Sequence, residues 1–391
     1  MRLRPEIAGI PESPLITIGT MAESLPGSIK LCYGEPDTAT PEFISRAAYD
    51  AALAGHTFYT HTAGTPELRQ AIATKANDLH GTGWSHDEIM ATVGATMALY
   101  ITIRACVGAG DNAIVISPAY GSFINAVRMS GAEPREVPLV RSGNRFMLDL
   151  DRVARAIDAR TRLLLVNSPS NPTGWVATVD EQRALYQLAE HHGLVLLADE
   201  VYERIVFNGS LAPSFARLTG GATDHLVVVN SFSKTYNMTG WRLGWLQASS
   251  KMVERMASAA EFITSNPTAA VQEAGIVALR DGEEFIVGQR ESYRQRRNQV
   301  LRATRGFPDW NVTDPDGAFF VFAKVDGVTD SASYAADLLR QTGVALTPGS
   351  AFGAAGEGHL RLCFAASPPA LDSALARLAT AIDVKDAASR S

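Results

Sequence analysis

The amino-acid sequence predicts an α/β fold, in which a large domain has a mixed, mostly parallel sheet covered by helices and a smaller domain is α+β. Three observations support this prediction. The 391 residues, 46% hydrophobic and 19% charged, suffice for one large core and a smaller one. Short apolar runs alternate with amphipathic stretches through the middle of the chain, as β-α-β units do. The last third of the chain has a different pattern.

The apolar runs in the middle of the chain predict buried strands. They lack period-two alternation, which is typical of a parallel sheet covered on both faces. The stretch 178–192 predicts a helix, because Thr178 is a suitable N-cap before two acidic residues and Gly193 can end the helix. Ligands of such sheets bind at the carboxyl ends of the strands. The predicted strands are 113–117, 163–167, 194–198 and 226–230.

The last third of the chain predicts the smaller domain. Its expected elements are a polar helix at about 282–303, a strand at 317–322, a helix near Ser333, a strand at Val344 and a strand–helix pair from His359. We expect the N-terminal segment to pack on this domain. The large domain would then span residues 50–285, and the small, discontinuous domain residues 1–49 with 286–391.

Composition and charge argue against several classes of function. The formal charge of −6 and a pI near 5.8 leave no basic excess, so we expect no nucleic-acid partner. Three scattered cysteines, Cys32, Cys106 and Cys363, predict neither a disulfide framework nor a metal site and suit a reducing cytoplasm. No stretch approaches the roughly 20 apolar residues of a membrane span, and the N-terminus lacks the apolar part of a signal peptide. We therefore expect no membrane association.

A lysine in a hydroxyl-rich loop is the most informative feature. The string S-F-S-K-T-Y-N-M-T-G-W-R-L-G begins at Ser231, directly after the last predicted strand of the middle region. The amine of Lys234 can form a Schiff base with an aldehyde. Ser231, Ser233 and Arg242 can bind a phosphate beside it. A solvated loop lysine is the alternative for an isolated S-x-S-K, but the whole string resembles a known signature for the attachment of a phosphorylated aldehyde to lysine.

An acidic residue follows the third predicted strand. Asp199, in A-D-E-V-Y, lies 35 residues before Lys234. At a strand's carboxyl end its carboxylate can pair with a protonated pyridine nitrogen and keep that ring an electron sink. Tyr202 can hydrogen-bond a phenolic oxygen on the same ring. Taken alone, Asp-Glu after a strand is usually only a strand end, and we interpret Glu200 and Glu203 as structural or surface residues.

Three further elements follow other predicted strands. Asn171, in N-S-P-S-N-P-T-G, can donate its amide to the same phenolic oxygen, although a plain turn is the alternative. The helix start T-V-G-A-T-M offers a phosphate the N–H groups of Ala95 and Thr96 and the Thr96 hydroxyl, although many α/β proteins have such helix starts. Tyr120, in S-P-A-Y-G-S, can stack on an aromatic ring or be an ordinary core tyrosine.

A late arginine and two N-terminal elements complete the candidate site. Arg361 interrupts the apolar H-L-R-L-C-F and needs a partner if it points inward. A substrate α-carboxylate can accept two hydrogen bonds from its guanidinium, whereas a structural ion pair or an edge-strand arginine is the alternative. The glycine turn C-Y-G-E-P-D allows the Gly34 backbone to approach the same carboxylate. Tyr59, which precedes G-T-P-E-L-R, belongs to a further element.

In chain order, these elements resemble the class I/II aminotransferases of fold type I, which depend on pyridoxal 5'-phosphate (PLP). The elements are G-E-P-D, Y-T with G-x-x-E-L-R, the G-A-T helix start, P-A-Y, N-P-T-G, D-E-V-Y, S-F-S-K and the late arginine, over about residues 14–382. The chain resembles the branch that contains the bacterial aspartate, aromatic and broad-specificity aminotransferases. The resemblance implies PLP on Lys234, which also moves the substrate proton, and a homodimer with shared sites in which Tyr59 contacts the neighbouring subunit's cofactor phosphate.

The chain departs from the family's pattern at three positions. Tyr120 stands where many relatives have tryptophan, Met97 where a polar residue is frequent, and Phe320 where G-A-F-Y is common. Tyrosine should preserve ring stacking, and the other two changes should affect substrate choice or packing more than reaction type. No arginine or lysine is assignable to a distal substrate carboxylate, so specificity for aspartate or glutamate is not predicted.

We therefore expect transfer of an amino group from an L-amino acid to a 2-oxo acid with ping-pong kinetics. Lys234, Asp199 and Tyr202 are the expected catalytic residues, and Gly34, Tyr120, Asn171 and Arg361 the expected substrate ligands. A PLP-dependent C–S β-lyase would use the same lysine, aspartate and arginine. A non-catalytic PLP-binding sensor is the other alternative. Transcription regulators of similar fold carry a winged-helix domain before this region, and we expect no such domain here because no residues are available for it before Arg4. The presence of Lys234 also favours catalysis.

Overall fold

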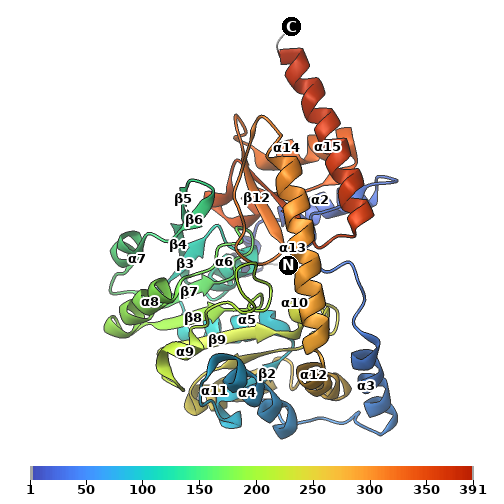
Figure 1. Ribbon diagram of the computed structural model, residues 1–391. Helices are drawn as coiled ribbons and strands as arrows, with labels where there is room; N and C mark the ends of the chain where they lie inside the picture. Colours follow the sequence, from blue (N-terminus) through green and yellow to red (C-terminus); the bar gives the residue numbers. More distant parts are fainter. Residues whose placement is uncertain (1–2, 390–391) are drawn as a thin grey trace.

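The computed structural model of the chain describes residues 3–389. A seven-stranded sheet forms the larger part, with the strand order β2-β10-β9-β8-β7-β3-β4 (Figure 1). Only β10 runs antiparallel to its neighbours, so the expected mixed, mostly parallel sheet is confirmed. The strands are β2 (Ile89–Thr92), β3 (Asn112–Ser117), β4 (Glu133–Pro138), β7 (Thr161–Asn167), β8 (Val195–Asp199), β9 (Leu226–Ser231) and β10 (Gly244–Gln247).

Apolar side chains cover both faces of this sheet, which explains why its strands show no period-two alternation. In β9, Val227 and Val229 pack into the core on one face, whereas Leu226 and Val228 pack into the core on the other. The four predicted strands correspond to β3, β7, β8 and β9, and no boundary differs by more than two residues. Because helices shield both faces, every side chain of such a strand is apolar or must find a polar partner.

The helices around this sheet begin and end with recognisable signals. Helix α8 starts with the expected Thr178 cap, because the Thr178 hydroxyl accepts from the Glu181 N–H at 3.2 Å and the Glu181 carboxylate accepts from the Thr178 N–H at 2.8 Å. The helices are α3 (Glu42–Leu53), α4 (Pro66–His80), α5 (Gly94–Cys106), α6 (Gly121–Met129), α7 (Leu150–Ala156), α8 (Val179–His191), α9 (Ala216–Thr219), α10 (Phe232–Thr235), α11 (Ser250–Glu261) and α12 (Ala269–Asp281).

A second, antiparallel sheet of four strands has the order β11-β12-β15-β14. Helix α13 runs from this sheet to α12 in the larger part (Figure 1). The N-terminal segment joins the second part, because β1 pairs with β13 and α2 packs against α14. The elements are α2 (Pro14–Glu23), β1 (Ile29–Lys30), α13 (Glu283–Thr304), β11 (Trp310–Val312), β12 (Phe320–Val325), α14 (Ser331–Thr342), β13 (Val344–Ala345), β14 (Thr347–Pro348), β15 (His359–Cys363) and α15 (Pro368–Ser389).

The predicted strand at 317–322 was wrong in its bounds, because the chain is still turning at Gly317. The N–H groups of Asp316 and Gly317 both donate to the Gly174 carbonyl, at 2.9 and 3.0 Å. Ala318 then adopts a positive φ of 57°. The regular strand β12 therefore starts only at Phe320.

The division into two domains stays a proposal. The expected boundaries after residues 49 and 285 fall inside α3 and α13, respectively. Helix α3 packs against α12 of the larger part. The smaller elements are α1 (Pro5–Ala8), the hairpin β5 (Val140–Ser142) and β6 (Arg145–Met147), and the 3₁₀ turns His86–Glu88, Gly349–Phe352 and Ala354–Gly356. Within residues 3–389, no helix is both long and apolar enough to cross a membrane.

The first residue of β10 lies against the start of α5 without room for a side chain. A Cβ atom on Gly244 would lie 2.6 Å from the Ala95 amide nitrogen, 2.8 Å from the Gly94 carbonyl carbon and 2.9 Å from the Asn230 carbonyl oxygen. All three are backbone atoms, which cannot move aside as the end of a flexible side chain can. The close approach of α5 to the sheet therefore depends on this glycine.

We expect Gly244→Ala to lower the free energy of unfolding by about 1–3 kcal/mol, because the methyl group forces backbone segments apart. Urea denaturation of both proteins measures this difference. Gly240→Ala is the matched control, since a Cβ on Gly240 would meet no atom within 4 Å. The control should stay within about 0.5 kcal/mol of the unaltered protein, and equal losses in the two variants would contradict the packing argument.

Candidate active site

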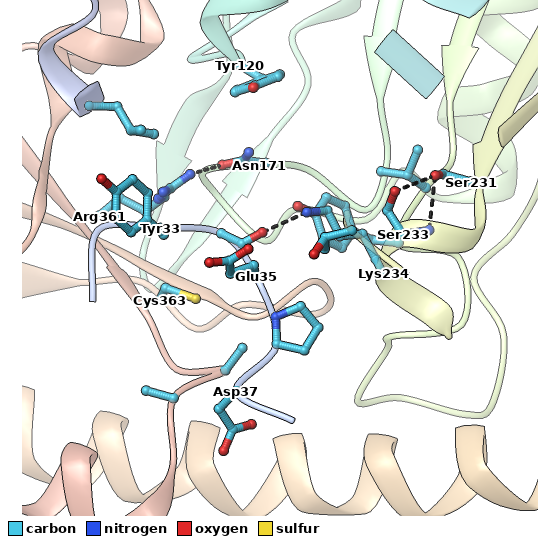
Figure 2. A pocket seen from close by; sticks show the side chains of 18 of the residues that line it. Tyr33, Glu35, Asp37, Tyr120, Asn171, Ser231, Ser233, Lys234, Arg361 and Cys363 are labelled. Atoms are coloured by element: carbon cyan, nitrogen blue, oxygen red, sulfur yellow. Dashed lines mark hydrogen bonds between the residues drawn. The ribbon is translucent and has the colours of Figure 1, made fainter. Parts of the chain in front are cut away.

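A cavity of about 1060 Å³ lies between the two parts of the chain, where the last residues of β7, β8 and β9 meet residues of β15 (Figure 2). The structure brings together all the predicted site residues except Tyr59. Those that line the cavity are Gly34, Ala95, Thr96, Tyr120, Asn171, Asp199, Tyr202, Ser231, Ser233, Lys234, Arg242 and Arg361.

Lys234 lies on the short helix α10, directly after β9. Its Nζ donates a hydrogen bond to the Gly34 carbonyl oxygen at 2.6 Å and pairs with no acidic group among residues 3–389 (Figure 2). Burial lowers the pKa of Lys234 from 10.5 to about 8. About a tenth of the amine is therefore uncharged at pH 7, far more than for an ordinary lysine, and an uncharged amine is the form that attacks an aldehyde.

Asp199 is the last residue of β8 and is only 4% exposed. Its Oδ1 accepts a hydrogen bond from the Val201 N–H at 3.1 Å, and the Asn167 amide donates to its carbonyl oxygen at 3.0 Å. Burial raises the pKa of the Asp199 carboxyl to about 7, because no cation in the described chain forms an ion pair with it. A cationic nitrogen bound in the cavity would stabilise the carboxylate form.

One end of the cavity gathers groups that bind anions. Helix α5 begins there at Gly94, so its first N–H groups and its dipole favour a negative charge. A Cβ on Gly94 would lie 2.3 Å from the Arg242 Nη2, so glycine lets the guanidinium approach the helix start. The Ser231 hydroxyl donates to the Ser233 hydroxyl at 2.9 Å (Figure 2). Hydroxyls, a guanidinium and a helix N-terminus together suit a phosphate.

Arg361 of β15 is buried, with 1% of its surface exposed. Its guanidinium donates to Asn171 Oδ1 at 2.8 Å (Figure 2), to the Thr347 hydroxyl at 3.1 Å and to the Cys32 carbonyl. Within the described residues it has no acidic partner and its Nε has no hydrogen bond. The alternative of a structural ion pair is therefore wrong, and the charge remains available for a carboxylate.

The contact with Arg361 also fixes the orientation of the Asn171 side chain. Because a guanidinium can only donate, the amide oxygen must face Arg361 and the amide NH₂ must face elsewhere. The Asn171 N–H donates to Asn167 Oδ1 at 2.7 Å, which holds this loop against the end of β7. The predicted donation from Asn171 to a cofactor oxygen stays a prediction, and this geometry leaves the NH₂ group able to make it.

The two tyrosines of the cavity have different environments. Tyr202 is 3% exposed and packs edge-on against Phe319 and Phe320, with ring centroids 5.3 and 5.8 Å away. Burial raises the pKa of the Tyr202 phenol well above its usual value, so the hydroxyl keeps its proton and can donate it in a hydrogen bond. Tyr120 lines the cavity and is 38% exposed. It is therefore not an ordinary core tyrosine.

Sequence reasoning did not single out Asn167 and Cys363 as site residues. Asn167, the first residue of N-S-P-S-N-P-T-G, positions both Asp199 and Asn171. Cys363 lies two residues after Arg361 on β15, and this spacing puts it on the same face of the strand. Tyr59 lies outside the cavity and is 89% exposed, so its expected contact with another subunit stays a prediction.

Comparisons with known proteins agree with this site. Residues 26–378 match the family model described as "Aminotransferase class I and II". An aspartate aminotransferase of Geobacillus stearothermophilus is 33% identical over 388 residues, which are 97% of this chain and 98% of the relative. A probable aspartate/prephenate aminotransferase of Thermus aquaticus is 36% identical and covers 90% and 91% of the two chains. The solved structure of the Thermus thermophilus aspartate aminotransferase with maleate is 35% identical, with a TM-score of 0.91 over 97% of this chain and 100% of that one.

These relatives are named aminotransferases, so the findings do not favour the alternatives of a C–S β-lyase or a non-catalytic sensor. Amino-group transfer between an amino acid and a 2-oxo acid with PLP as cofactor is the activity that they support. The match extends over nearly the whole length of both chains. The chain belongs to the class I and II aminotransferases, and it is a PLP-dependent transferase.

Proposed function

We propose that Lys234, Asp199 and Arg361 carry the transfer of an amino group from an L-amino acid to a 2-oxo acid. One observation supports these roles above all: the buried Asp199 and Arg361 and the partly buried Lys234 line one cavity, and none has an ion-pair partner in the described chain. Buried charges without partners are unfavourable. An amino acid bound together with PLP would supply a carboxylate for Arg361, a pyridine nitrogen for Asp199 and a carbonyl carbon for Lys234.

The residues that line the cavity fit this cofactor, and each of them would have a distinct role. When bound, PLP supplies an electron sink for the negative charge that develops at the substrate α-carbon. Lys234, with a pKa of about 8, can take a proton from the substrate and return it. Asp199 would hold the ring nitrogen in its protonated state, and the protonated Tyr202 would donate a hydrogen bond to the ring's phenolic oxygen. Arg361 would orient the α-carboxylate, which fixes the bond to be broken.

The anion-binding end of the cavity would hold the cofactor's phosphate. Ala95 and Thr96 would contribute N–H groups of the first turn of α5, and Ser231, Ser233 and Arg242 the hydroxyls and the guanidinium. Since this anchor and Arg361 lie on different strands and helices, the reacting atoms would be held from two sides. Such fixed orientation is a large part of catalysis by binding.

We further propose a homodimer with shared sites that acts in the cytoplasm. Tyr59 and its neighbour Phe58 are 89% and 81% exposed, and Phe262 is 86% exposed. Large exposed aromatic side chains are typical of protein–protein contacts, and a neighbouring subunit would place Tyr59 near the phosphate. The three cysteines form no disulfide, which suits a reducing compartment.

We expect the rate of PLP capture by the cofactor-free protein to rise about tenfold between pH 6 and 7 and to level off above about 8. The reason is that only the uncharged Lys234 amine reacts, and its pKa is lowered to about 8 by burial. Stopped-flow absorbance with borohydride trapping measures the rate. Lys234→Ala should leave no trapped adduct, and a rate that still rises tenfold per pH unit at pH 9–10 would show that the lysine keeps its ordinary pKa.

Arg361→Lys should lower kcat/KM for L-amino acids by roughly 10- to 100-fold, because lysine keeps the charge but loses the two-pronged contact with the carboxylate. Initial rates over a range of amino-acid concentrations measure this loss. Arg340→Lys is the control, since Arg340 is 63% exposed and pairs with Asp337 of α14. The assigned role fails if the two variants have the same kcat/KM.

We expect ping-pong kinetics, because one site must release the first 2-oxo acid before the second one binds. Initial rates plotted in double-reciprocal form at several acceptor concentrations should give parallel lines. Lines that intersect would contradict this order. Pyruvate and ammonia released from a cysteine-type substrate without any acceptor would instead indicate elimination.

A further inference from the structure

The turn after β8 presents its side chains to two different sides. Asp199 and Tyr202 line the cavity, whereas Glu200 and Glu203 do not and are only 1% and 7% exposed. The Glu203 N–H donates to the Glu200 carbonyl at 2.9 Å, and the Ile205 N–H donates to the Tyr202 carbonyl at 2.8 Å. One short hydrogen-bonded turn thus carries two groups for the cofactor on one side and two buried carboxylates on the other. Glu203 and Glu200 are therefore not surface residues.

Both carboxylates are tied to neighbouring elements. Glu203 Oε2 lies 2.9 Å from Nε2 of His80, which is the last residue of α4. Glu200 accepts from the Ser214 hydroxyl at 2.6 Å and from the Phe215 N–H at 2.7 Å. The bond to His80 joins segments 123 residues apart in the chain. It joins the turn directly to α4, whereas Arg204 of the turn and Lys75 of α4 are linked only indirectly, because both pair with Glu283.

Buried ionisable groups strengthen the hydrogen bond between His80 and Glu203. Asp199, Glu200 and Glu203 are three carboxyl groups buried within five consecutive residues, and burial raises the pKa of Glu200 to about 7. Among the ion pairs of the described residues, only His80 pairs with any of the three. Burial lowers the pKa of His80, but its hydrogen bond with Glu203 and that group's charge outweigh burial and raise it overall. Charged partners make a hydrogen bond shorter and stronger than neutral ones.

We propose that His80 is a positioning residue, whose hydrogen bond with Glu203 sets the place of Asp199 and Tyr202 in the active site. This inference rests on the roles proposed above for those two residues. His80 does not line the cavity, so it acts through the turn. Its imidazole is 6% exposed and lies beside a separate small cavity of about 20 Å³, which is lined by Arg204, Ser231 and Thr235 among others. Loss of the bond would free the turn to shift within its pocket.

The test compares stability with turnover in the holoenzyme of four proteins: the unaltered chain, His80→Gln, His80→Leu and the double variant His80→Leu/Glu203→Leu. His80→Leu leaves a buried carboxylate without its partner, so Tm should fall by several degrees, and removal of that carboxylate in the double variant should restore much of it. His80→Leu and the double variant both lack the hydrogen bond between residues 80 and 203. We expect kcat to fall about tenfold or more in both.

A spectroscopic reading separates positioning from stability. The absorbance of bound PLP changes with pH. In the proposed function, the midpoint of this change depends on the contacts of Asp199 with the ring nitrogen and of Tyr202 with the phenolic oxygen. We expect the midpoint to move by a similar amount in His80→Leu and in the double variant. His80→Gln, which keeps a donor toward Glu203, should recover most of both kcat and the midpoint. If His80→Leu does not fold, Glu203→Leu takes its place with the same expected shift, because it removes the other partner of the same hydrogen bond.

Asn77→Ala is the matched control on the same helix. Its side chain bonds the Trp84 carbonyl and the Trp84 N–H, both at 2.9 Å, and does not touch the turn. This variant should lower Tm and leave kcat and the midpoint unchanged. If kcat and the midpoint instead follow Tm in all variants, so that the double variant recovers all three, His80 only stabilises the fold and the inference is overturned. An unaltered protein that neither binds PLP nor transfers amino groups would defeat the proposed function itself.

Discussion

Asp199 and Arg361 are buried and Lys234 is partly buried, and the fold gives none of these ionisable groups an ion-pair partner in the described chain. The surrounding structure limits the cost. Backbone carbonyls, amides and hydroxyls replace part of the lost hydration of each group. The remaining imbalance shifts two pKa values toward neutrality, to about 8 for Lys234 and about 7 for Asp199. An amine and a carboxyl that titrate near pH 7 are suited to proton transfer.

The same hydrogen bonds hold the two parts of the chain together at the site. Lys234 follows a strand of the seven-stranded sheet and reaches Gly34 of the N-terminal segment, while Arg361 of the second sheet reaches Asn171 beside β7. In the proposed function, a substrate would take over these donors and replace contacts between the two parts. Binding and the arrangement of the two parts would therefore be coupled, because both would use the same N–H groups.

Around these groups, a layer of polar residues with no direct task in the reaction sets the geometry. Asn167 holds both Asp199 and the Asn171 loop, and Glu203 reaches back to His80. Glycines complete the layer where backbone must approach a functional group, as Gly94 does beside Arg242. Side chains with locked partners hold a site more rigidly than exposed ones, so the precision of the cavity depends on this outer layer.

The sequence by itself determined the strands that build the large sheet, the Thr178 cap and the family of elements around Lys234, because these depend on local periodicity and on neighbouring residues. Only the tertiary structure decided that strand β12 of the second sheet begins at Phe320, because the turn before this strand hydrogen-bonds to Gly174. It alone showed that Arg361 faces Asn171 instead of an acid and that His80 meets Glu203, contacts that span 190 and 123 residues. Local patterns cannot carry such pairings, because the choice of partner depends on how distant segments pack and on the cost of leaving a buried polar group unpaired.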